Sequence, residues 1–381
     1  MARPPDLIDD AVTEILLRLP PDDPACLVRA SLVCKAWREL LTGPAFLRRY
    51  RAFHGAPPLL GYSHNVYDEV PYARFVAADA RASPFSAPAF GRLNWWVLEC
   101  RHGRVLVQSF ERHASSNLLV WDPITGVQHQ VPVHMTYFCH TAAVLCGVAG
   151  CDHLNCHGGP FLVVSICIPY EEEEEQAVDF ISACVYSSET GACTSSPSIQ
   201  FDAYIEERPS LLARDALYFT LQQGRRILKY DLVGQGLQVI DAPDMFDGLA
   251  YGNLHLWSWQ AGPYGVAEWV QGRVIKLSTL LPTTGPLISL GVIGFLEGGT
   301  YTIFVSTDVG IFAVMPKSEQ MKKVCEGGFH HAIAPYMSFY TPGTGGVLIF
   351  NLYNALCAPY TFLWCCFLLC SLKSFSQTIS K

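Results

Sequence analysis

The chain of 381 residues has little charge, and its basic residues form no long tract. Asp, Glu, Lys and Arg make up 16% of it, against ~25% in a typical soluble domain. Its 26 basic and 34 acidic residues give a net charge of −8. Proteins that follow a phosphate backbone need clustered Lys and Arg, so we expect no nucleic-acid partner. Half of the residues are hydrophobic, which excludes an intrinsically disordered chain.

Signals for secretion are missing as well. The segment that begins at Met1 carries acidic residues at Asp9, Asp10 and Glu14, whereas a secretory signal needs an uninterrupted apolar core. No Asn-x-Ser/Thr sequon occurs, and the 15 cysteines are irregularly spaced. We therefore expect reduced thiols and a cytoplasmic or nuclear location, with membrane association as an open alternative that depends on the C-terminal segment.

The usual catalytic motifs do not occur. The chain has no Gly-x-Ser-x-Gly elbow, no glycine-rich phosphate loop and no His-Glu-x-x-His pair. Five adjacent glutamates, Glu171 to Glu175, repel one another and predict a solvated loop. Without a nucleophile and a base to activate it, we expect no enzymatic activity.

A cysteine- and histidine-rich stretch runs from Cys139 to His157. Cysteine and histidine are the ligands of tetrahedral zinc. However, the C-x₂-C spacing of structural zinc sites is absent, and reduced thiols with loop histidines explain the stretch without a metal. We therefore expect no cofactor and no metal, and the alternative is a zinc site made by Cys151, His153, Cys156 and His157.

Residues 6–50 are the only stretch with a clear helical period. Pro20-Pro21 and Gly43-Pro44 are expected to end helices, and Asp23 with Pro24 is expected to begin one. The spacing predicts three short helices. Two runs have apolar residues at i, i+3, i+4 and i+7, namely Val12, Ile15, Leu16 and Leu19, and then Val33, Ala36, Trp37 and Leu40.

Residues 51–343 contain short β-rich runs in pairs, separated by turn residues. Successive second members of these pairs are 65, 43, 39 and 45 residues apart. Three of these spacings match the ~40–50-residue period of propeller blades, and an insertion explains the first. A β-sandwich is the competing fold, but this period favours a β-propeller of five to seven blades. The second members are Leu119, Cys184, Ile227, Val266 and Ile311.

The last segment, 344–381, is hydrophobic. From Val347 to Leu372 there are 26 residues without a charged side chain, enough to span a membrane. Asn351, Asn354 and Pro359 interrupt this run. Three interpretations stay open: a buried or poorly ordered tail unrelated to the domain, a membrane anchor, or a final strand that closes the propeller.

The N-terminal pattern resembles an F-box. The resemblance is carried by Pro5-x-Leu7, by Glu14 to Pro20, by Leu27 to Arg29, and by Leu32 to Arg38. The order and spacing of the Ile-Leu-x-x-Leu-Pro and Val-Cys-x-x-Trp segments are typical of that family. The β region resembles the F-box-associated domains of plants, mainly through its Trp-Asp-Pro-x-Thr-Gly turn, Trp121 to Gly126.

The resemblance implies an α+β multidomain protein. Its parts are a helical F-box over 5–50, a β-propeller-like substrate-recognition domain over 51–343, and the hydrophobic tail. F-box proteins are substrate-receptor subunits of cullin–RING (SCF-type) ubiquitin ligases, so the implied partners are a Skp-type adaptor, a cullin reached through it, and a protein target. The alternative is a membrane-anchored F-box-containing interaction protein held by residues 347–372.

The resemblance also implies which residues contact each partner. Ala25-Cys26 departs from the larger aliphatic residues that the family often carries, which weakens docking without abolishing it. Tryptophans are expected anchors for a protein target, although a core position between blades competes for each. The adaptor residues are Pro5, Leu7, Ile15, Leu16, Leu19, Pro20, Leu27, Val33 and Trp37, and the tryptophans are Trp95, Trp96, Trp121, Trp257, Trp259 and Trp269.

Overall fold

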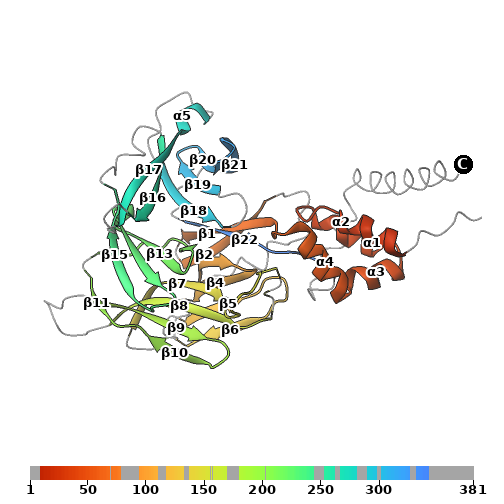
Figure 1. Cartoon of the computed structure of the whole chain (residues 1–381), viewed down its shortest axis with the longest axis horizontal. Coiled ribbons are helices and arrows are strands. Elements are labelled where there is room, and N and C mark those ends of the chain that lie inside the picture. The colour runs from red at the N-terminus through yellow and green to blue at the C-terminus, as the bar shows by residue number, and fades with distance from the viewer. Residues whose placement is uncertain are drawn as a thin grey trace, which may run out of the picture.

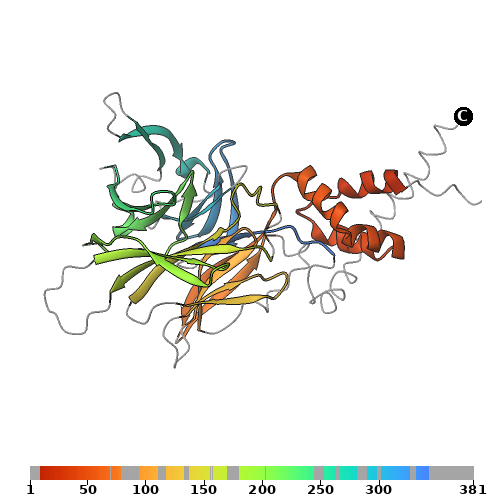
Figure 2. The same ribbon diagram turned by 60° about the horizontal axis from the view of Figure 1, so that its bottom comes forward.

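A helical domain is followed along the chain by a ring of antiparallel sheets (Figure 1). The helices lie to one side of the ring in both views (Figures 1 and 2). The structure is a computed structural model that describes residues 9–68, 70–78, 94–109, 117–132, 137–154, 156, 158–169, 180–201, 203–243, 253–261, 267–280, 290–297, 302–326 and 332–342.

The helical domain has four helices, where the sequence predicted three: α1 (Asp9–Leu17), α2 (Pro24–Ser31), α3 (Lys35–Thr42) and α4 (Pro44–His54). The missed helix begins at Pro44, a residue expected to end the preceding one. Proline at the first helical position has no N–H to leave unpaired, so it begins a helix as readily as it ends one. Phe46 and Tyr50, four residues apart, are both buried on the inner face of α4.

The start of α2 agrees with the sequence in position but not in detail. Pro24 is the first helical residue and Asp23 precedes it, as predicted. The Asp23 carboxylate makes no capping hydrogen bond to the helix backbone. It accepts instead from the Cys26 thiol at 3.1 Å and lies 3.7 Å from the Arg29 guanidinium.

Two polar contacts tie α4 to the end of α1. The Tyr50 hydroxyl donates to the Leu19 carbonyl at 2.9 Å, and His54 Nε2 lies 2.9 Å from the Leu17 carbonyl oxygen. Burial raises the pKa of Tyr50 well above its ordinary value, so the hydroxyl keeps the proton it donates. The apolar core beneath these contacts includes Leu16, Leu27 and Leu41.

Six antiparallel sheets form the ring. Five of them have three to five strands and are the blades of a five-bladed β-propeller, and the sixth is the two-stranded ribbon β16–β17. Small helices lie at Gln222–Gly224 and at Leu277–Leu280 (α5). The strands are β1 (Leu59–Asp68), β2 (Val70–Ala77), β3 (Trp95–Arg101), β4 (Arg104–Ser109), β5 (Asn117–Trp121), β6 (Gln128–Val131), β7 (Tyr137–Cys146), β8 (Phe161–Pro169), β9 (Phe180–Ser187), β10 (Ala192–Ser195), β11 (Ile199–Gln200), β12 (Leu211–Ala213), β13 (Ala216–Leu221), β14 (Arg226–Asp231), β15 (Leu237–Asp241), β16 (Asn253–Ala261), β17 (Ala267–Lys276), β18 (Leu290–Leu296), β19 (Thr302–Thr307), β20 (Gly310–Met315), β21 (Gln320–Glu326) and β22 (Ile333–Met337).

Apolar clusters between neighbouring sheets establish the order of the ring. One cluster joins β2-β1-β22 to β3-β4-β5-β6, a second joins the latter to β7–β10, and a third continues to β12–β15. Two more join β16–β17 to β18–β21, and β18–β21 back to the first sheet. Among the described residues, four of the six sheets contribute to two of these clusters each, whereas β12–β15 and β16–β17 contribute to one each. Burial of both faces of a sheet accounts for much of the hydrophobic content of this region.

The predicted blade period matches the strands. Leu119, Cys184, Ile227 and Ile311 lie on β5, β9, β14 and β20, each the third strand of a four-stranded path. Val266 lies outside the described residues. The long first interval contains the 14-residue connection from β7 to β8, so the prediction of an insertion and of a propeller with five to seven blades is confirmed.

The ring is closed by β22, which pairs antiparallel with β1. The Tyr336 hydroxyl on β22 also donates to the Gly103 carbonyl of the β3–β4 turn at 3.2 Å. This closing strand ends at Met337, before the hydrophobic tail. The tail, 344–381, lies outside the described residues, and among the described residues no helix has both the length and the apolar character to cross a membrane.

Candidate functional site

The adaptor residues implied by the sequence divide into three groups in the structure. Leu16 and Leu27 are buried in the helical core and pack within the domain. Ile15, Leu19 and Trp37 are half-buried. Pro20 and Val33 are exposed, whereas Pro5 and Leu7 lie outside the described residues.

The turn between α2 and α3 carries an apolar patch that its own domain does not cover. Leu32 and Val33 are 47% and 57% exposed, and Cys34 and Ala36 beside them are exposed too. Leu32 was not among the implied adaptor residues, although it begins the Leu-Val-Cys segment that carries the resemblance. Adjacent exposed aliphatic residues make this turn a candidate docking surface.

A cleft of about 380 Å³ lies between the helical domain and the ring. Its wall on the helical side is the linker Gly55, Ala56 and Pro57. The ring contributes the end of β3, the β7–β8 loop and residues 335–339. From this last segment Phe339 enters the helical core, where its ring meets Tyr50 edge-on at 6.1 Å. The two domains therefore share packing at the cleft.

Arg101 at the floor of the cleft joins three blades. Its Nε and Nη2 donate to the two carboxylate oxygens of Glu297, which follows β18, at 2.9 and 2.7 Å. Nη2 also reaches the carbonyl of Ser210, before β12, at 3.2 Å, and Nη1 contacts Glu99 on β3. The Ser210 hydroxyl donates to Glu99 Oε2 at 2.7 Å, and the Leu212 amide donates to Glu297 at 2.7 Å.

Burial sets the protonation of this network. It raises the pKa of Glu99 to about 8, with Arg101 opposing the shift and Glu297 adding to it. Two carboxyl groups thus share one guanidinium, and near neutral pH one of them is protonated. A perturbed carboxyl in a cleft is a candidate for acid–base catalysis, but here Arg101 and Ser210 occupy both of its oxygens. The arrangement holds blades together.

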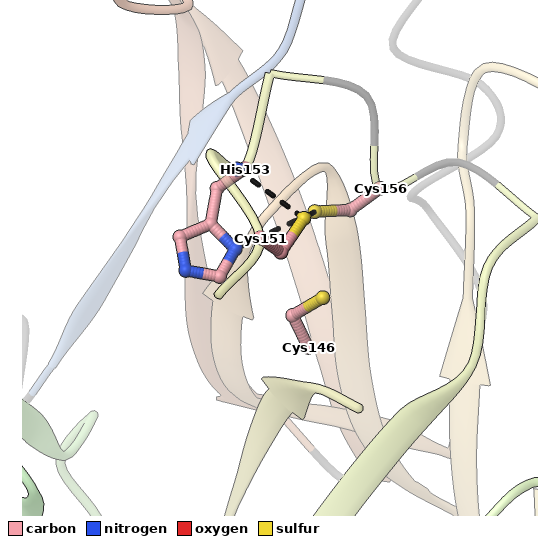
Figure 3. A group of neighbouring side chains, drawn as sticks. All are labelled: Cys146, Cys151, His153 and Cys156. Atoms are coloured by element: carbon pink, nitrogen blue, oxygen red, sulfur yellow. Dashed lines mark hydrogen bonds between the residues drawn. The ribbon is translucent and has the colours of Figure 1, made fainter. Parts of the chain in front are cut away.

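The β7–β8 loop gathers three of the four predicted metal candidates. The Sγ atoms of Cys151 and Cys156 and Nδ1 of His153 converge, and Cys146 at the end of β7 supplies a fourth donor (Figure 3). All four donor atoms lie within 4.8 Å of one another. His157, the fourth residue of the predicted set, lies outside the described residues. Cys146, which four residues separate from Cys151, was not in the predicted set.

Of the six predicted tryptophan anchors, two are buried, three are half-buried and one is exposed. Trp95 and Trp121 are buried and pack edge-on at 5.8 Å. Trp96 and Trp257 are half-buried. Among these six, only Trp259 on β16 is exposed, at 41%. Its ring lies 4.9 Å from that of Trp269 on β17.

The family model for the F-box domain matches residues 5–49, which include α1 to α3 and the first part of α4. The chain therefore has an N-terminal F-box domain, followed by a five-bladed β-propeller. An F-box implies binding to a Skp-type adaptor, and the proteins that carry one are generally non-catalytic. A comparison with curated proteins found no match.

Several solved structures share part of the arrangement, all at low identity. The nidogen/laminin complex is 9% identical over 74% of this chain and 98% of that chain, with a TM-score of 0.38. The periplasmic gluconolactonase PpgL of Pseudomonas aeruginosa is 12% identical over 70% and 82%, with a TM-score of 0.40. TolB of Acinetobacter baumannii is 13% identical over 75% and 69%, with a TM-score of 0.36. Likenesses this weak carry no argument about function.

Proposed function

We propose that this F-box and propeller chain is the substrate-receptor subunit of a cullin–RING ubiquitin ligase. The F-box docks on a Skp-type adaptor, which connects it to the cullin, and the propeller binds a protein target. The observation that carries the proposal is the F-box match over residues 5–49 on a domain that leaves an apolar patch uncovered. The proposal implies a location in the cytoplasm or the nucleus. We also propose that the propeller is an F-box-associated β domain of the plant type.

The adaptor surface follows from what the helical core leaves outside. The core is complete without Pro20, Leu32 and Val33, because Leu16, Leu27, Leu41 and Phe339 fill it. Burying exposed aliphatic side chains against a partner stabilises the complex by about 25 cal/mol per Å² of apolar surface. Leu32 and Val33 therefore form, with Pro20, the adaptor surface that we propose.

Replacing Val33 by aspartate tests the adaptor surface. A carboxylate forced into an apolar interface loses its hydration without gaining a partner. We expect V33D to weaken adaptor binding at least tenfold, or about 1.4 kcal/mol. The measurement is a titration of purified Skp-type adaptor against the full chain by calorimetry.

The matched control is V233D. Val233 is 81% exposed and lies after β14, on the propeller. V233D makes the same change of side chain, and we expect this variant to bind the adaptor as tightly as the wild type does. Thermal unfolding of both variants checks that they are folded. Equal adaptor affinity for V33D and the wild type would contradict the docking assignment.

The proposed target surface is the ribbon β16–β17. The Trp259 ring packs at a tilt of 59° against that of Trp269, whose Nε1 donates to the Asp241 carbonyl at 2.7 Å. Val270 and Val274, which follow Trp269 on β17, are exposed as well. A tryptophan already held in place by a neighbour loses little entropy on binding, and such residues dominate interface energies.

Replacing Trp259 by alanine tests that surface. We expect W259A to lose about 2 kcal/mol of target affinity, the threshold of an interface hot spot, while adaptor affinity is unchanged. The measurement compares ubiquitin-bound proteins that the wild type and W259A retain when the ligase is blocked. Y204A is the control, because Tyr204 is an exposed aromatic residue on another part of the ring. If W259A retains the same proteins in the same amounts as Y204A, the ribbon is not the target surface.

A further inference from the structure

The β7–β8 loop is shaped to hold four side chains around one point. Cys146 is the last residue of β7 and pairs with Phe161 at the start of β8, so the two ends of the loop are fixed. The Gly147 amide donates to the Pro160 carbonyl at 2.9 Å just beyond this pair. Gly150 and Gly158 have φ values of +67° and +69°, which let the chain turn sharply before Cys151 and after Cys156.

His153 is held in a conformation that most residues avoid. Its φ of +57° lies in the left-handed region, which residues other than glycine adopt rarely. This conformation turns its ring toward the thiols, and the ring of His102 stacks on it at 4.0 Å with an interplanar angle of 7°. Strain of this kind persists where the surrounding structure or a ligand requires it.

Two distances between the donor atoms match the edges of a tetrahedral zinc site, and all four donor atoms lie within 4.8 Å of one another. Zinc bonds of about 2.3 Å to sulfur and about 2.0–2.1 Å to nitrogen give tetrahedral edges of about 3.8 Å between sulfurs and about 3.6 Å between sulfur and nitrogen. Cys151 Sγ lies 3.8 Å from Cys156 Sγ, and Cys156 Sγ lies 3.6 Å from His153 Nδ1. The sulfur separation is also far longer than the ~2.05 Å of a disulfide.

An amide donor and a buried cation lie beside the group. The His153 amide donates to Cys151 Sγ at 3.4 Å. The guanidinium of Arg104 is buried, donates to the carbonyls of Cys156 and Gly159, and leaves its Nη1 without a hydrogen-bond partner among the described residues. Three thiolates, one neutral imidazole and Zn²⁺ carry a net charge of −1, which offsets this buried cation.

We propose that Cys146, Cys151, His153 and Cys156 bind one zinc ion in a closed structural site. Four protein ligands leave no open position for water, so the ion stabilises the loop and does no chemistry. Binding releases the protons of the three thiols. The proposal is independent of the ligase assignment and replaces the expectation that the chain carries no metal.

The position of the site gives it a role in joining the two domains. Leu154 follows the ligand His153 and packs against the core of the helical domain. Asp152, His153 and Leu154 line the cleft opposite the linker Gly55 to Pro57. By fixing the loop, the ion also fixes this contact between the propeller and the F-box.

The test is metal analysis of the full chain purified under reducing conditions. We expect one zinc ion per chain after gel filtration. X-ray absorption should show three sulfur ligands at about 2.3 Å and one nitrogen ligand at about 2.0–2.1 Å. C146S and C156S should lose the ion in competition with a chelator, whereas C193S should keep it because Cys193 is exposed and outside the group. H153C should keep the ion with four sulfur ligands.

Three results would overturn the proposal. They are a wild-type chain that holds well under one zinc ion after preparation with zinc, a C146S variant that holds zinc as the wild type does, and a Cys151–Cys156 disulfide in the purified chain. The absorption spectrum of the wild type decides the matter even where a cysteine variant fails to fold. Chelation of the wild type should also speed trypsin cleavage after Arg51, the last arginine or lysine before the linker between the two domains.

Discussion

Replacing Arg101 by methionine is expected to lower the free energy of unfolding by about 3–5 kcal/mol. Arg101 is only 7% exposed. Its guanidinium contacts Glu297, Ser210 and Glu99, which lie on three blades. Methionine fills most of the volume but donates no hydrogen bond. The Glu297 carboxylate then loses its counterion, and the Ser210 carbonyl loses a donor. Urea unfolding followed by tryptophan fluorescence measures the change.

Two further substitutions separate burial from charge. Arg226 pairs with Asp241 at 3.3 Å near the surface, so R226M is expected to cost under about 1 kcal/mol. R101K keeps the charge but loses the planar fork that binds both oxygens of Glu297, and it should fall between the two. If R101M and R226M change stability equally, the network does not hold the blades together.

The sequence predicted most of the fold because its signals are local. The period of Val12, Ile15, Leu16 and Leu19 predicts α1 without knowledge of any other segment. Recurrent strand pairs give the blade period in the same way. The fourth helix was missed because Pro44 satisfies the sequence rules for both the end of one helix and the start of another.

The ring closure and the polar contacts were out of reach for the opposite reason. The partners lie far apart in the sequence: β22 pairs with β1, and Glu297 binds Arg101 from another blade. No periodic pattern encodes such pairs. The same limit applies to Cys146: the sequence shows cysteines and histidines close together, but only the hairpin between β7 and β8 decides which donors converge.

Stability should fall as the pH rises from about 5 to about 8, and Glu99 should be the cause. Its folded-state pKa of about 8 exceeds its ordinary value of 4.5, because burial disfavours the charged form. Between these values the folded chain holds a proton that the unfolded chain has lost. The contribution is therefore fully present below pH 4.5 and lost as the pH passes through 8. Its steepest slope is about 1.4 kcal/mol per pH unit.

Glu99→Gln isolates this contribution because glutamine copies the protonated carboxyl. Its carbonyl oxygen accepts from Arg101, and its amide donates to the Ser210 hydroxyl, as the protonated Glu99 does once that hydroxyl rotates. We expect the difference in stability between the wild type and E99Q to change across this pH range. E319Q, at an exposed glutamate, should follow the wild type at every pH. Parallel curves for the wild type and E99Q would show that Glu99 is ionised in the folded chain. Two carboxylates would then share Arg101 as their counterion. R101M would lower the free energy of unfolding more at high pH than at low pH.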